Sequence, residues 1–190
     1  MGIVPTDDLI SLLEQDHQAI RERFSELDGA AADDRPHLFW ELVEQLVRHE
    51  VAEEAVVYPA VRQEPGGATV AEARVAEEAE TEQLLARIEK LDPTTEEFVG
   101  AVRDLYTAVL QHAEMEEQEV FGLLWANEEP GYLALLGQKF KGEKLAAPSH
   151  PHPHAPHAAV AHKFIGPIAA FVDRVRDDSR ARASGVRPAE

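Results

Sequence analysis

Residues 49–59 read HEVAEEAVVYP, and residues 112–121 repeat the same pattern without a gap as HAEMEEQEVF. The two copies share a His, two Glu, a Val and an aromatic residue. Side chains at i and i+4 of a helix lie about 40° apart on one face, so His49 points the same way as Glu53, and His112 the same way as Glu116. A single pair of this kind is commonly an exposed polar pair. Two copies in one helical chain indicate metal ligands.

Apolar residues at three- and four-residue spacing predict four helices around these copies. The first is expected to start near Thr6 and to end before Gly29. The second starts near Pro36, bends near Pro59 and ends at residues 65–67, the third spans about residues 69–91, and the fourth runs from a cap at Thr94 to residue 127. Read as two hairpins, these segments predict an all-α fold, an antiparallel up-down four-helix bundle with extra C-terminal helical segments.

His17 falls on the apolar stripe of the first predicted helix. A lone His there is more often a core residue than a ligand, unless another ligand meets it. His17 lies 11 residues before Asp28, and His49 lies 13 residues after Pro36. At about 1.5 Å per residue, both imidazoles are roughly 16–20 Å from the same loop, so they can meet.

The third predicted helix has one charged interior position, Glu78, on a face otherwise formed by Val75, Thr81, Leu85 and Ile88. The candidate ligands are therefore His17, His49, Glu53, Glu78, His112 and Glu116. Six such residues suit two metal ions, because carboxylates from two helices can bridge the ions while imidazoles bind each end. Nitrogen and oxygen donors without thiolate favour iron or manganese, with zinc as an alternative.

Composition narrows the class of protein. The chain has 190 residues, 44% hydrophobic content, no Cys and a formal net charge of −18. Such a charge repels nucleic acids and anionic membranes, and no apolar run reaches the roughly 20 residues of a membrane span. Residues 1–5 do not resemble a signal peptide. We therefore expect a cytoplasmic protein, monomer or homodimer, whose partners are small molecules rather than nucleic acid or membrane.

The predicted organisation has four parts: a helical bundle over residues 1–128, a short extra helix over 129–147, a His/Pro-rich linker over 148–159, and an amphipathic segment with a tail over 160–190. The alternating Pro residues of the linker predict an extended spacer. Its imidazoles offer a second interpretation, loose binding of Cu²⁺, Ni²⁺ or Zn²⁺. The last segment is expected to dock on the bundle or on another subunit.

The order of these motifs resembles the hemerythrin-like domain, also called the HHE cation-binding domain, over about residues 7–127. The resemblance implies a four-helix bundle around a non-haem di-iron centre, in which the matching positions are His17, His49, Glu53, His112 and Glu116. The chain departs from the family on the third helix, where the family usually has a His. Aligning Leu84 and Leu85 with the family's leucines puts Glu78 at that place, and Glu77 and Glu82 remain alternatives.

Replacing an imidazole by a carboxylate adds a hard anionic donor, which stabilises ferric iron and lowers the reduction potential. We therefore favour a centre of two iron ions that reacts with hydrogen peroxide or O₂, a catalase-like or oxidative-stress role that the family resemblance allows. Glu53 and Glu116 would bridge, the three His would be terminal, and Glu78 would complete the set. One alternative is a module that binds, stores or senses iron, O₂ or NO without turnover, and another is a metal-free structural bundle.

Overall fold

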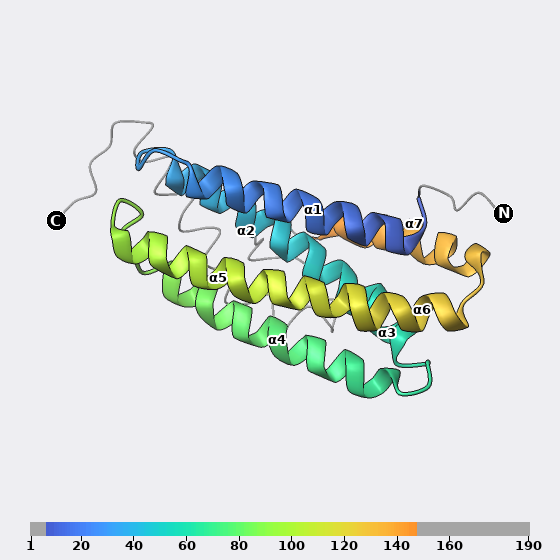
Figure 1. Ribbon diagram of the computed structural model, residues 1–190. Helices are drawn as coiled ribbons and strands as arrows, with labels where there is room; N and C mark the ends of the chain where they lie inside the picture. Colours follow the sequence, from blue (N-terminus) through green and yellow to red (C-terminus); the bar gives the residue numbers. More distant parts are fainter. Residues whose placement is uncertain (1–6, 148–190) are drawn as a thin grey trace, which may run out of the picture.

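The computed structural model describes residues 7–147, and every regular element in that range is helical (Figure 1). In chain order the elements are α1 (Leu9–Asp28), α2 (Arg35–Ala52), the π-helix η1 (Glu53–Val57), α3 (Tyr58–Val61), α4 (Gly67–Ile88), α5 (Glu96–Met115), the π-helix η2 (Glu116–Val120), α6 (Phe121–Asn127) and α7 (Pro130–Ala146). The all-α prediction is confirmed for these residues. The predicted linker at 148–159 and the segment at 160–190 lie outside the described range.

Short polar side chains start two of the long helices. Asp8 accepts a hydrogen bond from the Ser11 N–H of α1 at 3.0 Å. Thr95 accepts one from the Phe98 N–H of α5 at 3.2 Å. The predicted cap at Thr94 is wrong by one residue, because the Thr94 hydroxyl instead donates to Asp92 in the preceding turn. Each cap satisfies one backbone donor that the helix itself leaves unpaired.

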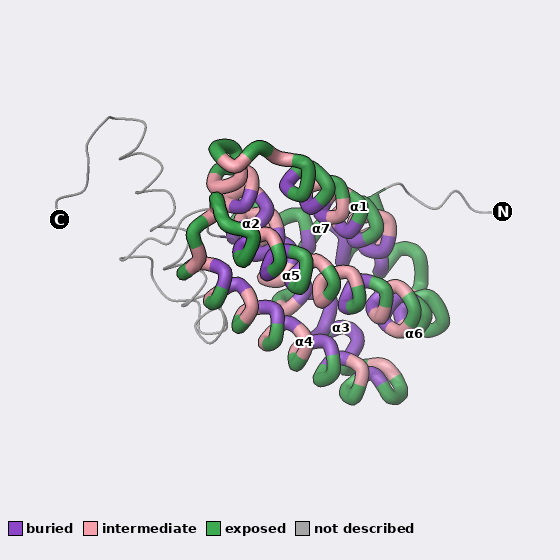
Figure 2. The backbone as a smooth tube through the Cα atoms, turned by 60° about the vertical axis from the view of Figure 1, so that its left-hand side comes forward, coloured by how far each residue is buried: buried purple, intermediate pink, exposed green. Residues whose placement is uncertain are grey.

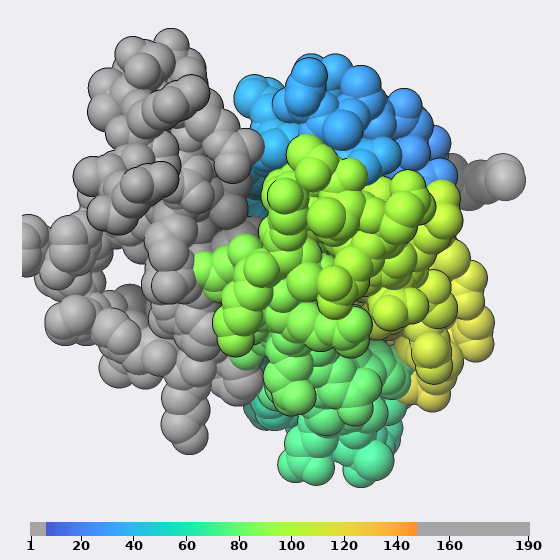
Figure 3. Space-filling model, turned by 90° about the vertical axis from the view of Figure 1, so that its left-hand side faces the viewer, coloured from blue at the N-terminus to red at the C-terminus, as the bar shows by residue number. Residues whose placement is uncertain are grey.

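The long helical stretches pack as two hairpins that lie side by side. α1 packs on α2 and α4 packs on α5, while the fifth long helix, α7, lies against α1, α2 and η1 (Figure 1). The arrangement fits a four-helix bundle with one added helix. Both hairpin turns lie at one end of the molecule, the end that faces the viewer in Figure 3. At this end Arg103 of α5 contacts Asp28 at 3.0 Å, and Arg35 donates to the Pro93 carbonyl at 3.4 Å.

The buried apolar residues form two clusters along the bundle, on the helix faces that point inward (Figure 2). The cluster near the hairpin turns includes Phe24, Leu42, Leu85 and Leu105. The second cluster includes Leu13, Tyr58, Val120 and Phe140. On the four long stretches of the two hairpins, the candidate ligands predicted from the sequence fall between the positions that contribute to the two clusters, except that Glu53 comes one residue after Ala52 of the second cluster. The candidate centre is therefore a polar layer between two apolar ones.

Two π-helical segments interrupt the second and fourth long stretches, a feature that the sequence did not predict. Glu53 begins η1 and Glu116 begins η2, and their carbonyls accept from the N–H groups of Tyr58 and Phe121 five residues later. Insertions of this kind occur mostly at functional sites. Since the second copy of the motif has Gly122 where the first has Pro59, the proline is not the shared cause of the two insertions.

None of the helices in residues 7–147 is both long enough and apolar enough to cross a membrane.

Candidate metal centre

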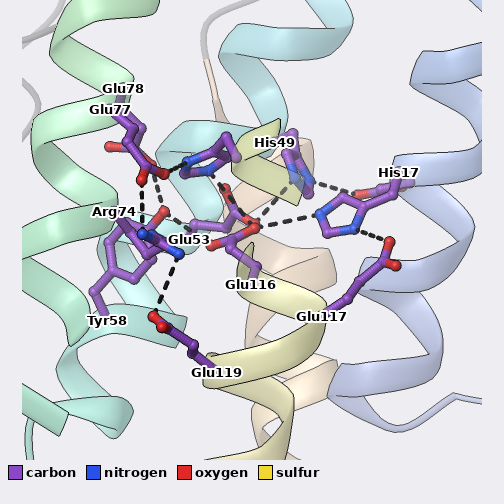
Figure 4. A network of polar contacts seen from close by, with 12 residues as sticks. His17, His49, Glu53, Tyr58, Arg74, Glu77, Glu78, Glu116, Glu117 and Glu119 are labelled. Carbon is purple, nitrogen blue, oxygen red and sulfur yellow. Dashed lines mark hydrogen bonds and ion pairs between the residues drawn. The ribbon is translucent and has the colours of Figure 1, made fainter. Parts of the chain in front are cut away.

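The six ligands predicted from the sequence come together inside the bundle (Figure 4). They form two overlapping groups, one of His17, His49, Glu53 and Glu116, and the other of Glu53, Glu78 and His112. In each group, one ligand atom from every residue lies within 4.8 Å of the others. Glu53 belongs to both groups and its side chain is 0% exposed. Two neighbouring cation positions that share one carboxylate match the arrangement expected of a two-metal site.

The Nε2 atoms of the three imidazoles point at the shared carboxylates. His49 Nε2 lies 3.0 Å from Glu53 Oε1. His17 Nε2 lies 3.3 Å, and His112 Nε2 lies 3.6 Å, from the same oxygen of Glu116, Oε2. Glu116 therefore sits between the two groups, as Glu53 does.

Several of these atoms are fully buried and close to one another but make no well-aligned hydrogen bond: Nε2 of His17 and His112, both carboxylate oxygens of Glu53, and Oε2 of Glu116. Buried polar atoms are nearly always paired, and leaving one unpaired costs about 1–3 kcal/mol. Here these nitrogen and oxygen atoms face one another in one place. Nitrogen and oxygen atoms of this kind fit a pair of iron, manganese or zinc ions, which would satisfy all of them at once.

Each imidazole is also held from behind, through Nδ1, by a carboxylate. The partner is Asp16 for His49 at 3.3 Å, Glu117 for His17 at 2.9 Å and Glu77 for His112 at 3.0 Å. A carboxylate that accepts the Nδ1–H leaves the Nε2 lone pair free for a metal, and it fixes the orientation of the ring. Sequence reasoning missed this role for all three carboxylates.

Each of the three carboxylates next to a ligand is in turn paired with a cation. Lys144 lies 2.5 Å from Asp16, Arg21 lies 2.9 Å from Glu117, and Arg74 lies 2.6 Å from Glu77. Three lines of cation, carboxylate and imidazole therefore converge on the centre from different helices. The signal in the sequence is that each carboxylate directly precedes or follows a ligand, as in Asp16-His17, Glu77-Glu78 and Glu116-Glu117.

Among the three candidate ligands on α4, the structure places Glu78 inside the centre. Its side chain is buried, and its Oε1 lies 2.6 Å from the hydroxyl of Tyr58. Glu77 faces His112 Nδ1 instead, and Glu82 is not among the ligand groups found in residues 7–147.

Tyr58, the aromatic residue of the first motif copy, reaches two carboxylates of the centre. Its side chain is fully buried, and its hydroxyl lies 2.6 Å from Glu78 and 3.0 Å from Glu116. The hydroxyl has one proton, so it donates to one carboxylate at a time. Burial is the main reason that the pKa of Tyr58 lies well above its usual value, and the negative charge of Glu116 raises this pKa further. The phenol therefore stays protonated.

The carboxyl groups of the centre do not ionise alike. Burial, reinforced by Glu116, raises the pKa of Glu53 well above its usual value, and burial with Glu50 does the same to the pKa of Glu78. Burial also disfavours ionised Glu116, but His112 and His17 outweigh it and lower the pKa of Glu116 to about 2. A metal ion would therefore replace protons on Glu53 and Glu78, since carboxylates bind metals in the ionised form.

Protonation of His112 follows from the same neighbours. Burial lowers the pKa of this imidazole, but Glu116 and Glu77 outweigh burial and raise it to about 9. Without a metal, a protonated His112 therefore balances part of the negative charge of Glu116.

A small cavity borders the centre on the side of the hairpin turns. Its volume is about 20 Å³, which is room for about one water molecule. It is lined by ligands of the centre and by apolar side chains, among them Ile20, Phe24, Leu46, Val109 and Ala113. A molecule that reaches the centre from this side must be very small.

Comparisons with known proteins agree with the geometry. The family model described as the hemerythrin HHE cation binding domain matches residues 8–124. An uncharacterized hemerythrin-like protein of Schizosaccharomyces pombe is 26% identical over 166 residues, which cover 86% of this chain and 82% of that protein. A protein named DNA nickase from a Nostoc species is 27% identical over 148 residues, which cover 72% of this chain but 42% of that protein. No solved structure matches the chain.

Proposed function

Because the chain belongs to the hemerythrin HHE cation-binding family, we propose that its centre holds two iron ions and reacts with hydrogen peroxide or O₂. The observation that carries this proposal is the pair of overlapping ligand groups that share Glu53 and contain buried nitrogen and oxygen atoms without partners. We take the four long stretches as the antiparallel up-down bundle of that family, with α7 added. Manganese or zinc is the alternative occupant.

His17 and His49 would bind one ion, and His112 with Glu78 would bind the other. Glu53 would bridge the two, since it belongs to both groups. Glu116 would be the second bridge, because one of its oxygens lies 3.3 Å from His17 and 3.6 Å from His112. When bound, the two iron ions would supply one-electron oxidation and reduction steps side by side in the same centre.

Hydrogen peroxide is the favoured substrate because of the donor set. Glu53, Glu78 and Glu116 provide three carboxylates, and anionic oxygen donors favour ferric over ferrous iron. In the overall reaction, one peroxide is oxidised to O₂ and gives up two electrons and two protons, while a second accepts them and becomes two waters. Those protons must pass between the two peroxides. The Tyr58 hydroxyl, which is not among the proposed ligands and lies 2.6 Å from Glu78 and 3.0 Å from Glu116, would be the group of the chain that passes them.

The second candidate function is a module that binds, stores or senses iron, O₂ or NO without turnover. The cavity of about 20 Å³ beside the centre suits molecules of a few atoms, O₂ and NO as well as peroxide, and does not separate the two functions. Both candidates therefore share the same class of partner, small molecules, and we propose a cytoplasmic monomer or homodimer for either.

The DNA nickase activity in the name of the Nostoc relative is not part of the function proposed for this chain. The match spans 42% of that protein, and the net charge of −18 here opposes contact with a polyanion.

Oxygen evolution from hydrogen peroxide tests the proposal. We expect the iron-loaded protein to release one O₂ for every two peroxides, and the Glu53→Gln variant to lose this activity together with at least one iron ion. Protein that binds two irons but leaves peroxide intact would overturn the catalytic proposal in favour of binding or sensing. Protein that takes up no metal would leave only a structural bundle.

A further inference from the structure

Helix α7 lies outside the family match at residues 8–124 but contributes to the surroundings of a ligand. Nζ of Lys144 lies 2.5 Å from both carboxylate oxygens of Asp16, and one of those oxygens lies 3.3 Å from Nδ1 of His49. The ring of Phe140 also meets His49 edge-on, with 6.1 Å between ring centres. Helix α7 therefore contacts Asp16, which supports His49, and also packs on His49 itself.

The docking of α7 is tightly defined. Leu133, Leu136 and Phe140 are buried against the bundle. Gly137 passes so close to the start of α1 that a Cβ there would lie 2.6 Å from the Asp7 carbonyl oxygen and 2.9 Å from the Leu9 nitrogen. No side chain fits at that spacing, so the glycine allows the contact. Lys144, about two turns further along the helix, is thereby held over Asp16.

Asp16 needs such an anchor because it is not fully enclosed. Its side chain is 17% exposed, and that of Lys144 is 27% exposed. Without the ammonium group, the carboxylate is free to turn toward water and to leave the Nδ1–H of His49 without an acceptor. The imidazole then loses the contact that fixes its rotation and the direction of Nε2 toward Glu53.

We propose that Lys144 is a positioning residue of the metal centre, which acts through Asp16 on His49, so that docking of α7 tunes the cation position at His17 and His49. This inference rests on the proposed function only in requiring that two metal ions bind. The position at Glu78 and His112 has its own support from Glu77 and Arg74, so α7 affects it less.

Anaerobic titration of the full-length metal-free protein with ferrous iron, against a competing chelator, tests the inference. Removing a support of a metal-bound imidazole typically weakens metal binding by 10–100-fold. We expect Lys144→Met to raise the dissociation constant of one of the two positions by about tenfold and to change the other less than about threefold. Lys144→Arg should stay within about threefold of wild type at both.

Lys141→Met is the matched control, because Lys141 lies on the same helix and pairs with Asp7 at 2.9 Å, away from the centre. It should leave both iron positions unchanged. Circular dichroism and thermal melting of the metal-free variants check that α7 remains docked.

A double-mutant cycle with Asp16→Ala, which removes the acceptor of the His49 Nδ1–H, separates positioning from general stability. If Lys144 acts through Asp16, Lys144→Met adds less than about twofold in the Asp16→Ala background. Fully additive effects, or two wild-type iron affinities in Lys144→Met, would overturn the inference. Should Lys144→Met be too unstable to titrate, an unchanged affinity in Asp16→Ala would by itself overturn the inference. Wild-type protein that binds no iron would instead refute the proposed function.

Discussion

Nδ1 of His112 lies 3.0 Å from Oε2 of Glu77, which makes Glu77 a support of a ligand rather than a ligand. The next residue, Glu78, points about 100° further round the helix and lies in the centre. Glu77 and Glu78 are adjacent on one helix but have different roles, one as a hydrogen-bond partner of His112 and the other as a candidate ligand, so their substitutions should have different effects.

Glu77→Gln should weaken iron binding without removing it. The amide still accepts a hydrogen bond from Nδ1 but carries no charge, so we expect a loss of about tenfold in affinity at the His112 position. The affinity is measured by chelator competition. A matched control is Glu80→Gln, because Glu80 lies on the same helix and is exposed. An affinity loss in the control equal to that in Glu77→Gln would contradict the assigned role.

Glu78→His should keep two irons but change their chemistry. The imidazole restores the donor set usual in the family and removes an anionic oxygen, so the reduction potential should rise. We expect reoxidation of the reduced protein by O₂ to slow by about tenfold, which corresponds to about 1.4 kcal/mol. Stopped-flow absorbance after mixing with O₂ measures this rate, and a wild-type rate would mean that Glu78 does not set the potential.

Glu53→Met should abolish iron binding and stabilise the metal-free protein. Both carboxylate oxygens of Glu53 are buried without a well-aligned hydrogen bond, although Oε1 lies 3.0 Å from His49 Nε2. Removing such an unpaired group recovers about 1–3 kcal/mol, and methionine has a similar volume. Chemical denaturation of the metal-free wild type and of metal-free Glu53→Met measures the difference in their free energy of unfolding. A less stable variant would show that Glu53 has a partner in the metal-free state.

Stability of the metal-free protein should fall as the pH rises above about 5. The pKa values of Glu53 and Glu78 are raised by burial, so in this range the folded state holds protons that the unfolded state has lost. Burial lowers the pKa of His112, but Glu116 and Glu77 outweigh burial and raise it to about 9. Above the ordinary pKa of about 6.5, this imidazole therefore also makes the folded state less stable as the pH rises.

Iron affinity should rise over the same range, because the metal displaces these protons. Thermal melting and iron titration between about pH 5 and 9 measure the two trends, which should be opposite in sign. A metal-free protein that becomes more stable toward pH 9 would contradict the protonation states assigned to the centre.

Helical periodicity was enough to find the residues that meet in the candidate centre. His49 with Glu53 and His112 with Glu116 follow from the i, i+4 spacing, and His17 and Glu78 follow from polar residues on apolar stripes. These are properties of single helices, so they are readable without knowing how the helices pack. The all-α class follows for the same reason.

Features that depend on contacts between helices could not be read in this way. Asp16 and Glu117 lie next to ligands in sequence but meet imidazoles of other helices, which requires the rotation of each helix about its axis. Lys144 is 128 residues from Asp16, and no spacing rule links them. The π segments at Glu53 and Glu116 add one residue to a turn without a compositional signal, and the shift of the α5 cap from Thr94 to Thr95 reflects a local choice between two adjacent hydroxyls.

The most direct test is the iron stoichiometry and Mössbauer spectrum of protein reconstituted with ferrous iron and then exposed to air. Two ligand groups that share Glu53 predict two ferric ions per chain, magnetically coupled through their common bridges. Glu53→Gln should lose that coupling and at least one ion. One iron per chain, or two ions without coupling in the wild type, would contradict a centre built around the shared Glu53.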